Sequence, residues 1–248
     1  MSESGWRLLD WLRDAYAWEV TGKGALWLAV TFAAYIAARR LQARLGGNPV
    51  ANPVLIASAP IIALLVWSGT PYTDYANGGS VLLWLLGPAT VGLAVPLYLN
   101  FAEIRGALVP MAVALAVGST TAVLSAVLIG YALGADIETI RSLAPKSVTT
   151  PIAMGIAREI GGLPALTAAF VIITGVVGAI CGGALFNAVG VRDPRARGFA
   201  MGIAAHGIGT ARAFQVDWKS GTFSGIAMTL NGILTAILLP ALWIMLAR

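Results

Sequence analysis

Charged residues are scarce in this sequence, and their scarcity excludes an ordinary soluble domain. Only 11% of the 248 residues are Asp, Glu, Lys or Arg, whereas soluble domains carry about 25%. Hydrophobic residues make up 58% of the chain, and its mean hydropathy is +0.82. The composition therefore predicts a membrane protein and leaves no room for a soluble catalytic domain.

Cysteine and histidine are nearly absent, with one of each. Cys181 alone cannot form an internal disulfide, so we expect it to pack as a small residue. One Cys and one His cannot supply ordinary zinc ligation, so we expect no metal site, and nothing points to a cofactor. The string "GIGTAR" (207–212) lacks the third glycine and the preceding strand of a dinucleotide fingerprint. No pair of residues resembles a protease dyad. We therefore assign no catalytic residue and expect no enzyme.

Long apolar runs dominate what is present. A bilayer core about 30 Å thick needs roughly 20 apolar residues for each helical crossing. Besides six strong candidates, the runs 138–160 and 196–216 are more polar. Whether these two runs and the run 80–99 cross or re-enter the membrane is left open. The pattern predicts an all-α polytopic membrane protein with about seven or eight hydrophobic segments. The six strong candidates are residues 24–45, 50–68, 80–99, 105–134, 163–190 and 221–247.

Basic residues cluster in two loops, which predicts the orientation of the chain. Arg39, Arg40 and Arg44 lie at the end of the first span, and Arg192, Arg195 and Arg197 follow the span 163–190. This is the positive-inside pattern, so the net charge of +5 does not indicate a nucleic-acid surface. Residues 1–23 lack the features of a cleaved signal peptide and have apolar residues at helical spacing, so we expect an interfacial amphipathic segment there.

A weak internal repeat divides the rest of the chain. "GGNP", "GPAT" and "GSTTAVL" recur in the same order and at nearly constant offset as "GGLP", "GIGT" and "GILTAIL". The predicted repeats are residues 24–134 and 137–248, and the positions of the basic loops indicate that they are inverted. Inversion needs an odd number of crossings in each half, so one segment of each must turn back or be broken within the membrane. Residues 80–99 and 196–216, both interrupted by Gly or Pro, are the natural candidates and mark a transporter's binding site.

The string "LAPKSVTTP" (143–151) places a charge between two helix breaks. Pro145 and Pro151 each remove a backbone donor, which lipid cannot compensate. Lys146 would cost roughly 2.5 to 3.5 kcal/mol at the centre of the bilayer, so its placement is a functional hypothesis. Together with the following helix N-terminus these residues predict an anion site, unless Lys146 reaches a lipid headgroup and the prolines only kink the helix. The hydroxyls expected in that site belong to Ser147, Thr149 and Thr150.

A second polar string, "HGIGTARA" (206–213), supplies His206, Thr210 and Arg212. The arginine can grip a carboxylate through two parallel hydrogen bonds, and the histidine is a candidate proton relay. The alternatives are a packing role for His206 and a loop charge, or a salt bridge to Asp217, for Arg212. Thr90 and Asn231 could bind substrate or simply bridge helices.

The chain resembles the LrgB/CidB family over about residues 48–242. The resemblance is carried by "LLGPATVGLAVPLY", by "LAPKSVTTPIAMGIAREIGGLPALTAAFVIITGVVGA", by "DPRARGFAMGIAAHGIGTARA" and by "FSGIAMTLNGILTAILLP". It implies either of two functions. One is a holin-like or antiholin-like regulator of murein hydrolase activity and cell lysis. The other is a carrier of small carboxylates, as in the plastidal glycolate/glycerate translocator, which fuses an LrgA-like half to an LrgB-like half. An LrgA-like small membrane subunit is therefore the expected partner.

We predict a multi-pass protein of a bacterial inner or plasma membrane that moves small monocarboxylates such as pyruvate, glycolate or glycerate. A proton is the candidate coupling ion, and a homo-oligomer stays an option. Regulation of lysis in the manner of a holin is the alternative. The predicted substrate-binding residues are Lys146, Ser147, Thr149, Thr150, Thr210, Arg212, Asn231 and Thr90, with His206 as the proton relay.

Overall fold

The computed structural model describes residues 20–92 and 94–246, and every regular element within them is an α-helix. The all-α fold is therefore confirmed. The chain divides into two compact units, Met1–Gly92 and Leu93–Arg248, which are described separately below. Residues 1–19, which hold most of the predicted interfacial segment, lie outside the described residues.

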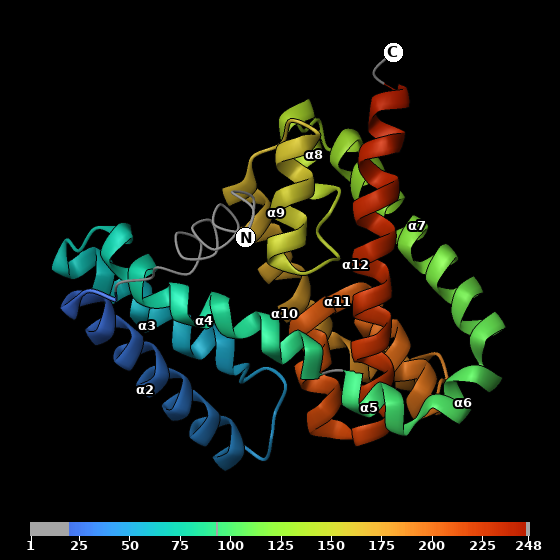
Figure 1. Cartoon of the computed structure of the whole chain (residues 1–248), viewed down its shortest axis with the longest axis horizontal. Coiled ribbons are helices and arrows are strands. Elements are labelled where there is room, and N and C mark those ends of the chain that lie inside the picture. Colours follow the sequence, from blue (N-terminus) through green and yellow to red (C-terminus); the bar gives the residue numbers. More distant parts are fainter. Residues whose placement is uncertain (1–19, 93, 247–248) are drawn as a thin grey trace, which may run out of the picture. The chain divides into compact units, whose positions relative to one another are not determined.

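Residues 20–92 contain α2 (Gly22–Arg44), α3 (Pro53–Ser68) and α4 (Tyr72–Gly92) (Figure 1). The start of α3 is fixed by Asn52, whose side chain accepts a hydrogen bond from the Val54 N–H. The start of α2 is tied to α4, because Asn77 Oδ1 accepts hydrogen bonds from the Thr21 N–H (2.9 Å) and hydroxyl (3.1 Å). The three helices thus form a packed unit of their own.

Residues 94–246 hold eight described helices, of which α7, α10 and α12 are long and apolar enough to cross a membrane. These three match the predicted spans 105–134, 163–190 and 221–247. The predicted span 24–45 corresponds to α2 and 50–68 to the shorter apolar helix α3, while 80–99 is divided between α4 and α5. The elements are α5 (Ala94–Leu99), α6 (Phe101–Gly106), α7 (Leu108–Ala132), α8 (Ile137–Leu143), α9 (Thr150–Glu159), α10 (Pro164–Ala188), α11 (Pro194–Val216) and α12 (Trp218–Leu246).

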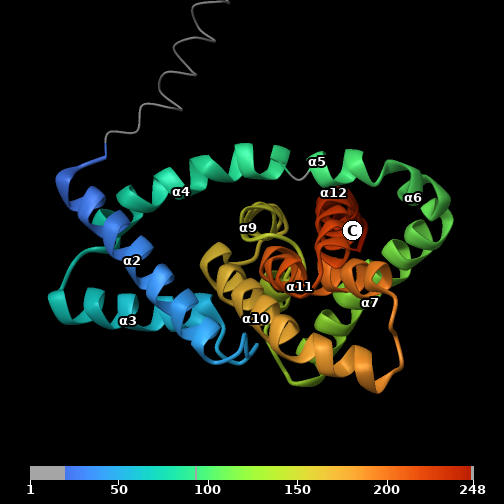
Figure 2. The same cartoon turned by 90° about the horizontal axis from the view of Figure 1, so that it is seen from below.

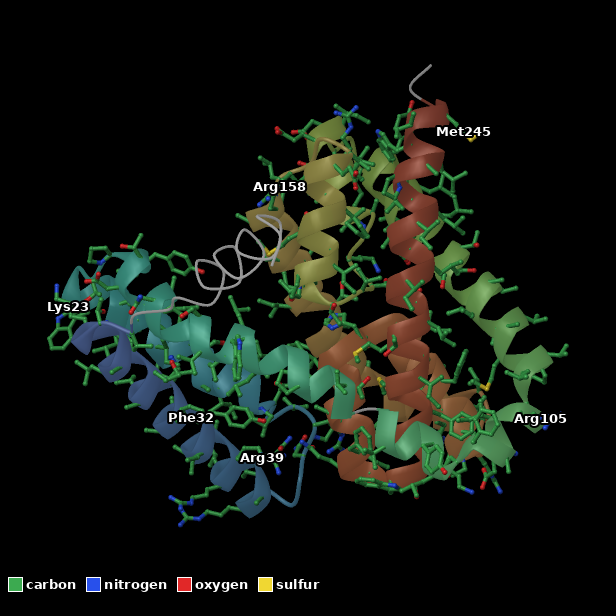
Figure 3. All side chains as sticks on the ribbon, in the orientation of Figure 1. Lys23, Phe32, Arg39, Arg105, Arg158 and Met245 are labelled. Carbon is green, nitrogen blue, oxygen red and sulfur yellow. The ribbon has the colours of Figure 1, made fainter. Side chains whose placement is uncertain are left out.

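Helices α8 and α9 form a re-entrant hairpin, here called the first hairpin (137–160). Its two ends meet, because the Leu163 N–H donates to the Ser142 hydroxyl at 2.8 Å. Its opening lies at the C-terminal end of α7, since a Cβ at Gly130 would contact Ile140 and Leu143. In Figure 3, Arg158 near the end of α9 and Met245 near the end of α12 lie toward one end of this unit and Arg105 toward the other. Residues 138–160 therefore turn back within this unit.

Helix α11 also turns back, and it is called the second hairpin (194–216). A Cβ at Gly209 would lie 2.9 Å from Met201 Cγ, eight positions earlier in the chain. Gly202 and Thr210 both contact Ser224, so the two arms reach the same level of α12. The turn is at His206, whose φ of 41° and ψ of −134° interrupt the helix. The expected break within residues 196–216 is therefore confirmed at His206.

The two hairpins enter from opposite ends of the second unit, and their tips meet midway along the spanning helices. The second hairpin opens at what we call the basic end, where Arg192, Arg195 and Arg197 lie. The tip of each hairpin lies near the middle of α12, because Asn231 contacts the carbonyl oxygens of Ser147 and Ile203. Figure 2 shows α11 between α10 and α12.

Within the second unit, two segments that each consist of a hairpin and a spanning helix are inverted relative to each other. The first hairpin with α10 (137–188) and the second hairpin with α12 (194–246) have the same order of elements and opposite directions. The helices that carry the matched strings 118–124 and 232–238 are not inverted relative to each other. Helices α7 and α12 run in the same direction and pack side by side. The predicted halves, 24–134 and 137–248, stay a prediction.

Close packing of α11 on α12 makes Gly202 sensitive to substitution. A Cβ at Gly202 would collide with the Ser224 carbonyl oxygen, a backbone atom that cannot move independently of α12. Gly202→Ala is therefore expected to cost about 2 kcal/mol of stability and to lower the melting temperature of the purified protein in detergent. Gly207→Ala is the matched control, because the nearest atom to its Cβ would be Met228 Sδ at 3.9 Å. Equal melting temperatures for the two variants would contradict this packing.

Candidate functional site

The tip of the first hairpin is an irregular segment, residues 144–149. Helix α8 is capped at its start by Asp136, and Pro145 lies just past its end. Turn hydrogen bonds join the Lys146 N–H to Leu143 O (3.1 Å) and the Val148 N–H to Pro145 O (3.2 Å). Pro151 then occupies the first turn of α9, where a missing N–H has no cost. The prolines thus open a short non-helical stretch that carries Lys146 and Ser147.

A cavity of about 790 Å³ lies against this tip. Its walls come from α7, from the first arm of α11 and from Phe223 of α12. On α11 it follows one helical face from Arg195 to Ala204, a distance of about 13 Å at 1.5 Å per residue. Lys146 and Ser147 line it at the deep end, beside Ile203, and Asp193 and Arg195 line it at the basic end.

The two cations that line this cavity differ in their partners. Arg195 at the basic end forms a bidentate pair with Asp193, with Nη2 to Oδ2 at 2.7 Å and Nε to Oδ1 at 3.2 Å. Hydrogen bonds from the Arg195 side chain, and then from its backbone N–H, lower the pKa of Asp193 below its usual value. Lys146 is half-buried, and its Nζ donates to Ser147 Oγ at 3.5 Å. No carboxylate of the described residues forms an ion pair with Lys146. The deep end therefore holds a lysine without a carboxylate partner among the described residues.

His206 forms the tip of the second hairpin. It is only 3% exposed, and its Nε2–H donates to the Val171 carbonyl oxygen of α10 at 2.9 Å. That bond assigns the proton to Nε2 in the neutral ring, because a carbonyl can only accept. The Thr210 hydroxyl donates to the His206 carbonyl at 2.8 Å and lies 2.8 Å from Ser224 Oγ. These contacts hold a backbone conformation that non-glycine residues rarely adopt.

Asn231 connects the two tips. Its Nδ2 group donates to the Ser147 carbonyl and to the Ile203 carbonyl, both at 3.2 Å. Its Oδ1 accepts a hydrogen bond of 2.5 Å from the Ser119 hydroxyl of α7. Asn231 is 1% exposed, so these partners are all buried with it. A single side chain thus joins α12, α7 and both hairpins.

The predicted site residues fall into three groups: those that line the cavity, those at the meeting point of the hairpins, and four others. Lys146 and Ser147 line the cavity. Thr210, Asn231 and His206 lie at the meeting point of the hairpins and bond to other protein groups. These contacts agree with the bridging alternative for Asn231 and the packing alternative for His206.

Of the remaining predicted residues, Thr149, Thr150 and Arg212 are not among the described residues that line the cavity. Thr149 is the N-cap of α9 and Thr150 its first residue, and both are half-buried. Arg212 lies on the second arm of α11, where its Nη1 donates to Gln215 Oε1 at 3.3 Å. Thr90 belongs to α4 of the other unit, and its side chain lies outside the described residues. Substrate contacts by these four residues stay predictions.

Three polar residues of the site were not predicted from the sequence. Thr121 lines the cavity, Ser119 bonds to Asn231, and Ser224 bonds to Thr210. The string "GSTTAVL" holds two of them and was noted only as half of a repeat. Hydroxyl residues on apolar helices commonly bond to their own backbone, so the sequence alone does not identify those that face a site. In the described part of the chain, no group of three or more His, Cys, Asp or Glu residues could hold a metal ion.

The unusual backbone of His206 leads to a prediction that separates its backbone from its side chain. His206→Ala removes the bond to Val171 and keeps a Cβ at positive φ, whereas His206→Gly removes both the bond and the strain. We expect the glycine variant to be more stable than the alanine variant by about 1 kcal/mol. Melting temperatures in detergent measure the difference. An alanine variant that is the more stable of the two would show that the turn is not strained.

Comparison with known proteins places these features in a family. The chain matches the LrgB-like family over residues 31–245. The protein YwbG of Bacillus subtilis is 38% identical over 219 residues, which cover 88% of this chain and 97% of that protein. The holin-like protein CidB of Staphylococcus epidermidis is 34% identical over 228 residues, which cover 89% and 96%. CidB of Staphylococcus aureus is 34% identical over 217 residues, which cover 88% and 94%. No solved structure matches the chain. With its three long apolar helices and its match over most of its length, this membrane protein belongs to the LrgB-like family.

Proposed function

We propose that the protein is a carrier of small monocarboxylates in the inner or plasma membrane of a bacterium. The observation that supports this most directly is the cavity that ends at Lys146, a half-buried cation with no carboxylate partner among the described residues. A charge held inside a membrane domain is expensive, so its placement in a cavity favours a role in binding an anion. The two hairpin tips beside it resemble the discontinuous segments that form substrate sites in transporters.

The chemistry of the deep end suits one carboxylate. The Lys146 ammonium would donate to a carboxylate oxygen, and the hydroxyls of Ser147 and Thr121 can donate to that group or to a neighbouring oxo group. Lys146 already donates weakly to Ser147, at 3.5 Å, so a closer acceptor would replace that contact. One carboxylate neutralises the single unpaired charge, which favours monocarboxylates over dicarboxylates.

The route to the site begins at the basic end. The cavity extends from Lys146 to Asp193 and Arg195. The positive-inside pattern favours a cytoplasmic location for this end. Glu103 and Lys219, paired at 2.8 Å, join α6 to the start of α12 near the same end. We propose that this structure is open toward the cytoplasm, and that movement of the hairpin tips exposes the site to the other side.

A holin-like regulator of murein hydrolase activity and lysis is the second candidate. It is favoured by the name of the CidB relatives, which are called holin-like proteins. Such a function needs association of helices into a lesion or complex and makes no demand on Lys146. An LrgA-like small membrane subunit is the proposed partner under either function, and a homo-oligomer is a further option.

Reconstituted vesicles distinguish the two candidates. The full chain, with and without the LrgA-like subunit, is tested for uptake of labelled pyruvate and for release of a trapped fluorescent dextran. A carrier should show uptake that saturates with pyruvate concentration while the dextran is retained. Dextran release together with uptake that never saturates would support the holin-like function and contradict the carrier.

A further inference from the structure

The walls of the cavity are apolar between its two polar ends. Met111 and Ala114 of α7, Phe199 and Ile203 of α11, and Phe223 of α12 line the stretch between Lys146 and Arg195. Among the described lining residues, hydrogen-bonding side chains occur only at the two ends, as Thr121, Lys146 and Ser147 at one and Asp193 and Arg195 at the other. A ligand bound to Lys146 by its carboxylate would therefore place the rest of its chain against hydrocarbon.

We propose that the preferred substrates are monocarboxylates of about four to six carbons in total with a branched or extended apolar chain, such as branched 2-oxo acids. This inference rests on the proposed carrier function and specifies its substrate class. A hydroxyl on the chain would lose its bonds to water and find no partner on these walls, which disfavours glycerate. Each methylene group placed against Phe199 or Ile203 would instead be removed from water.

The size of the cavity agrees with a larger ligand. A water molecule occupies about 30 Å³ in the liquid, and we take this as an upper value for each non-hydrogen atom of a ligand. The six non-hydrogen atoms of pyruvate then need at most about 180 Å³. The cavity offers about 790 Å³. The nine such atoms of a six-carbon 2-oxo acid need at most about 270 Å³, so the cavity accommodates either acid, and the choice between them depends on its apolar walls. A branched acid of five or six carbons fills more of the space and remains within the length between Lys146 and the basic end.

The basic end does not favour a second carboxylate. Arg195 is the other cation among the described lining residues, and Asp193 already accepts from it at both carboxylate oxygens. A dicarboxylate would have to displace this pair in a position where both residues are exposed to solvent and gain little. The carboxylate site and the apolar walls therefore define a ligand with one charged head and one apolar tail.

Uptake into vesicles containing the full chain and its LrgA-like subunit tests the inference. The compounds are labelled glycerate, pyruvate, 3-methyl-2-oxobutanoate and 4-methyl-2-oxopentanoate. We expect kcat/KM to rise about fourfold for each added methylene group that is buried, and glycerate to be the poorest substrate. Equal or better transport of glycerate would overturn the substrate class and leave the carrier function intact. Absence of saturable uptake for all four compounds would overturn both.

Two substitutions of alanine by leucine on α7 test the contribution of these walls directly. Ala114→Leu projects a larger side chain into the cavity, whereas Ala116 is exposed on α7 outside it and provides the control Ala116→Leu. We expect Ala114→Leu to raise KM for 4-methyl-2-oxopentanoate at least fivefold more than for pyruvate, and the control to leave the ratio unchanged. An unchanged ratio in Ala114→Leu would show that the chain of the substrate lies elsewhere.

Discussion

Replacing Lys146 with methionine should abolish saturable pyruvate uptake, with kcat/KM falling by about 100-fold or more. Methionine keeps the length and the apolar stem of the side chain and removes only the charge. A hydrogen bond to a charged group contributes about 1.5 to 3 kcal/mol, which corresponds to roughly 10-fold to 150-fold in binding, and low dielectric around the tip strengthens it. The measurement is uptake of labelled pyruvate into vesicles that contain equal amounts of folded protein.

Two further variants make this result specific. Lys219→Met removes a lysine that pairs with Glu103 and does not line the cavity, so uptake should change by less than about threefold. Lys146→Arg keeps the charge with a different shape, so it should retain part of the activity. Wild-type uptake by the Lys146→Met variant would contradict the proposed anion site. Dextran release that is unaffected by the substitution would support the holin-like function.

The sequence predicted the parts of the site that depend on unusual local chemistry. Two prolines around Lys146 marked the tip of the first hairpin, because a charge and missing backbone donors are both costly in lipid. Glycines around His206 likewise marked the second break. The residue that takes the positive φ could not be predicted, since histidine adopts such a conformation only when surrounding contacts hold it.

What the sequence could not predict depends on contacts between distant segments. The sequence did not indicate that Asn231 contacts α7 and both hairpins, or that Arg212 lies on the second arm of α11 and not among the described residues that line the cavity. A polar residue on an apolar helix has the same sequence pattern whether it meets a ligand or a carbonyl of another helix. The re-entrant course of residues 138–160 also required the contact between Ser142 and Leu163.

The meeting of the two hairpins explains how this fold could hold the proposed binding site without a regular helix through it. Each tip leaves backbone carbonyls without helical partners, and these must be satisfied within the protein. Asn231 satisfies one from each tip, at Ser147 and at Ile203. Because Lys146 directly precedes Ser147, the position of the cavity's charge depends on the same amide group. Stability of the tips and affinity of the site are therefore coupled.

Asn231→Leu should consequently destabilise the protein and abolish uptake together. Leucine is similar in size but leaves the Ser147 carbonyl, the Ile203 carbonyl and the Ser119 hydroxyl without this partner. At about 1 kcal/mol or more for each buried group, the loss is about 3 kcal/mol, seen as a melting temperature lower by roughly 6 to 12 °C in detergent.

Asn231→Asp and Ser119→Ala separate bridging from ligand binding at this position. The aspartate keeps the acceptor for Ser119 but loses both donors, so it should be nearly as destabilised as the leucine variant. If Asn231 bridges the helices, Asn231→Leu combined with Ser119→Ala should cost less than the sum of the single substitutions, because each removes the same hydrogen bond. If Asn231 instead binds substrate, the variants should melt like the wild type and differ only in KM. Since its amide already meets two carbonyls and a hydroxyl, we expect the first result.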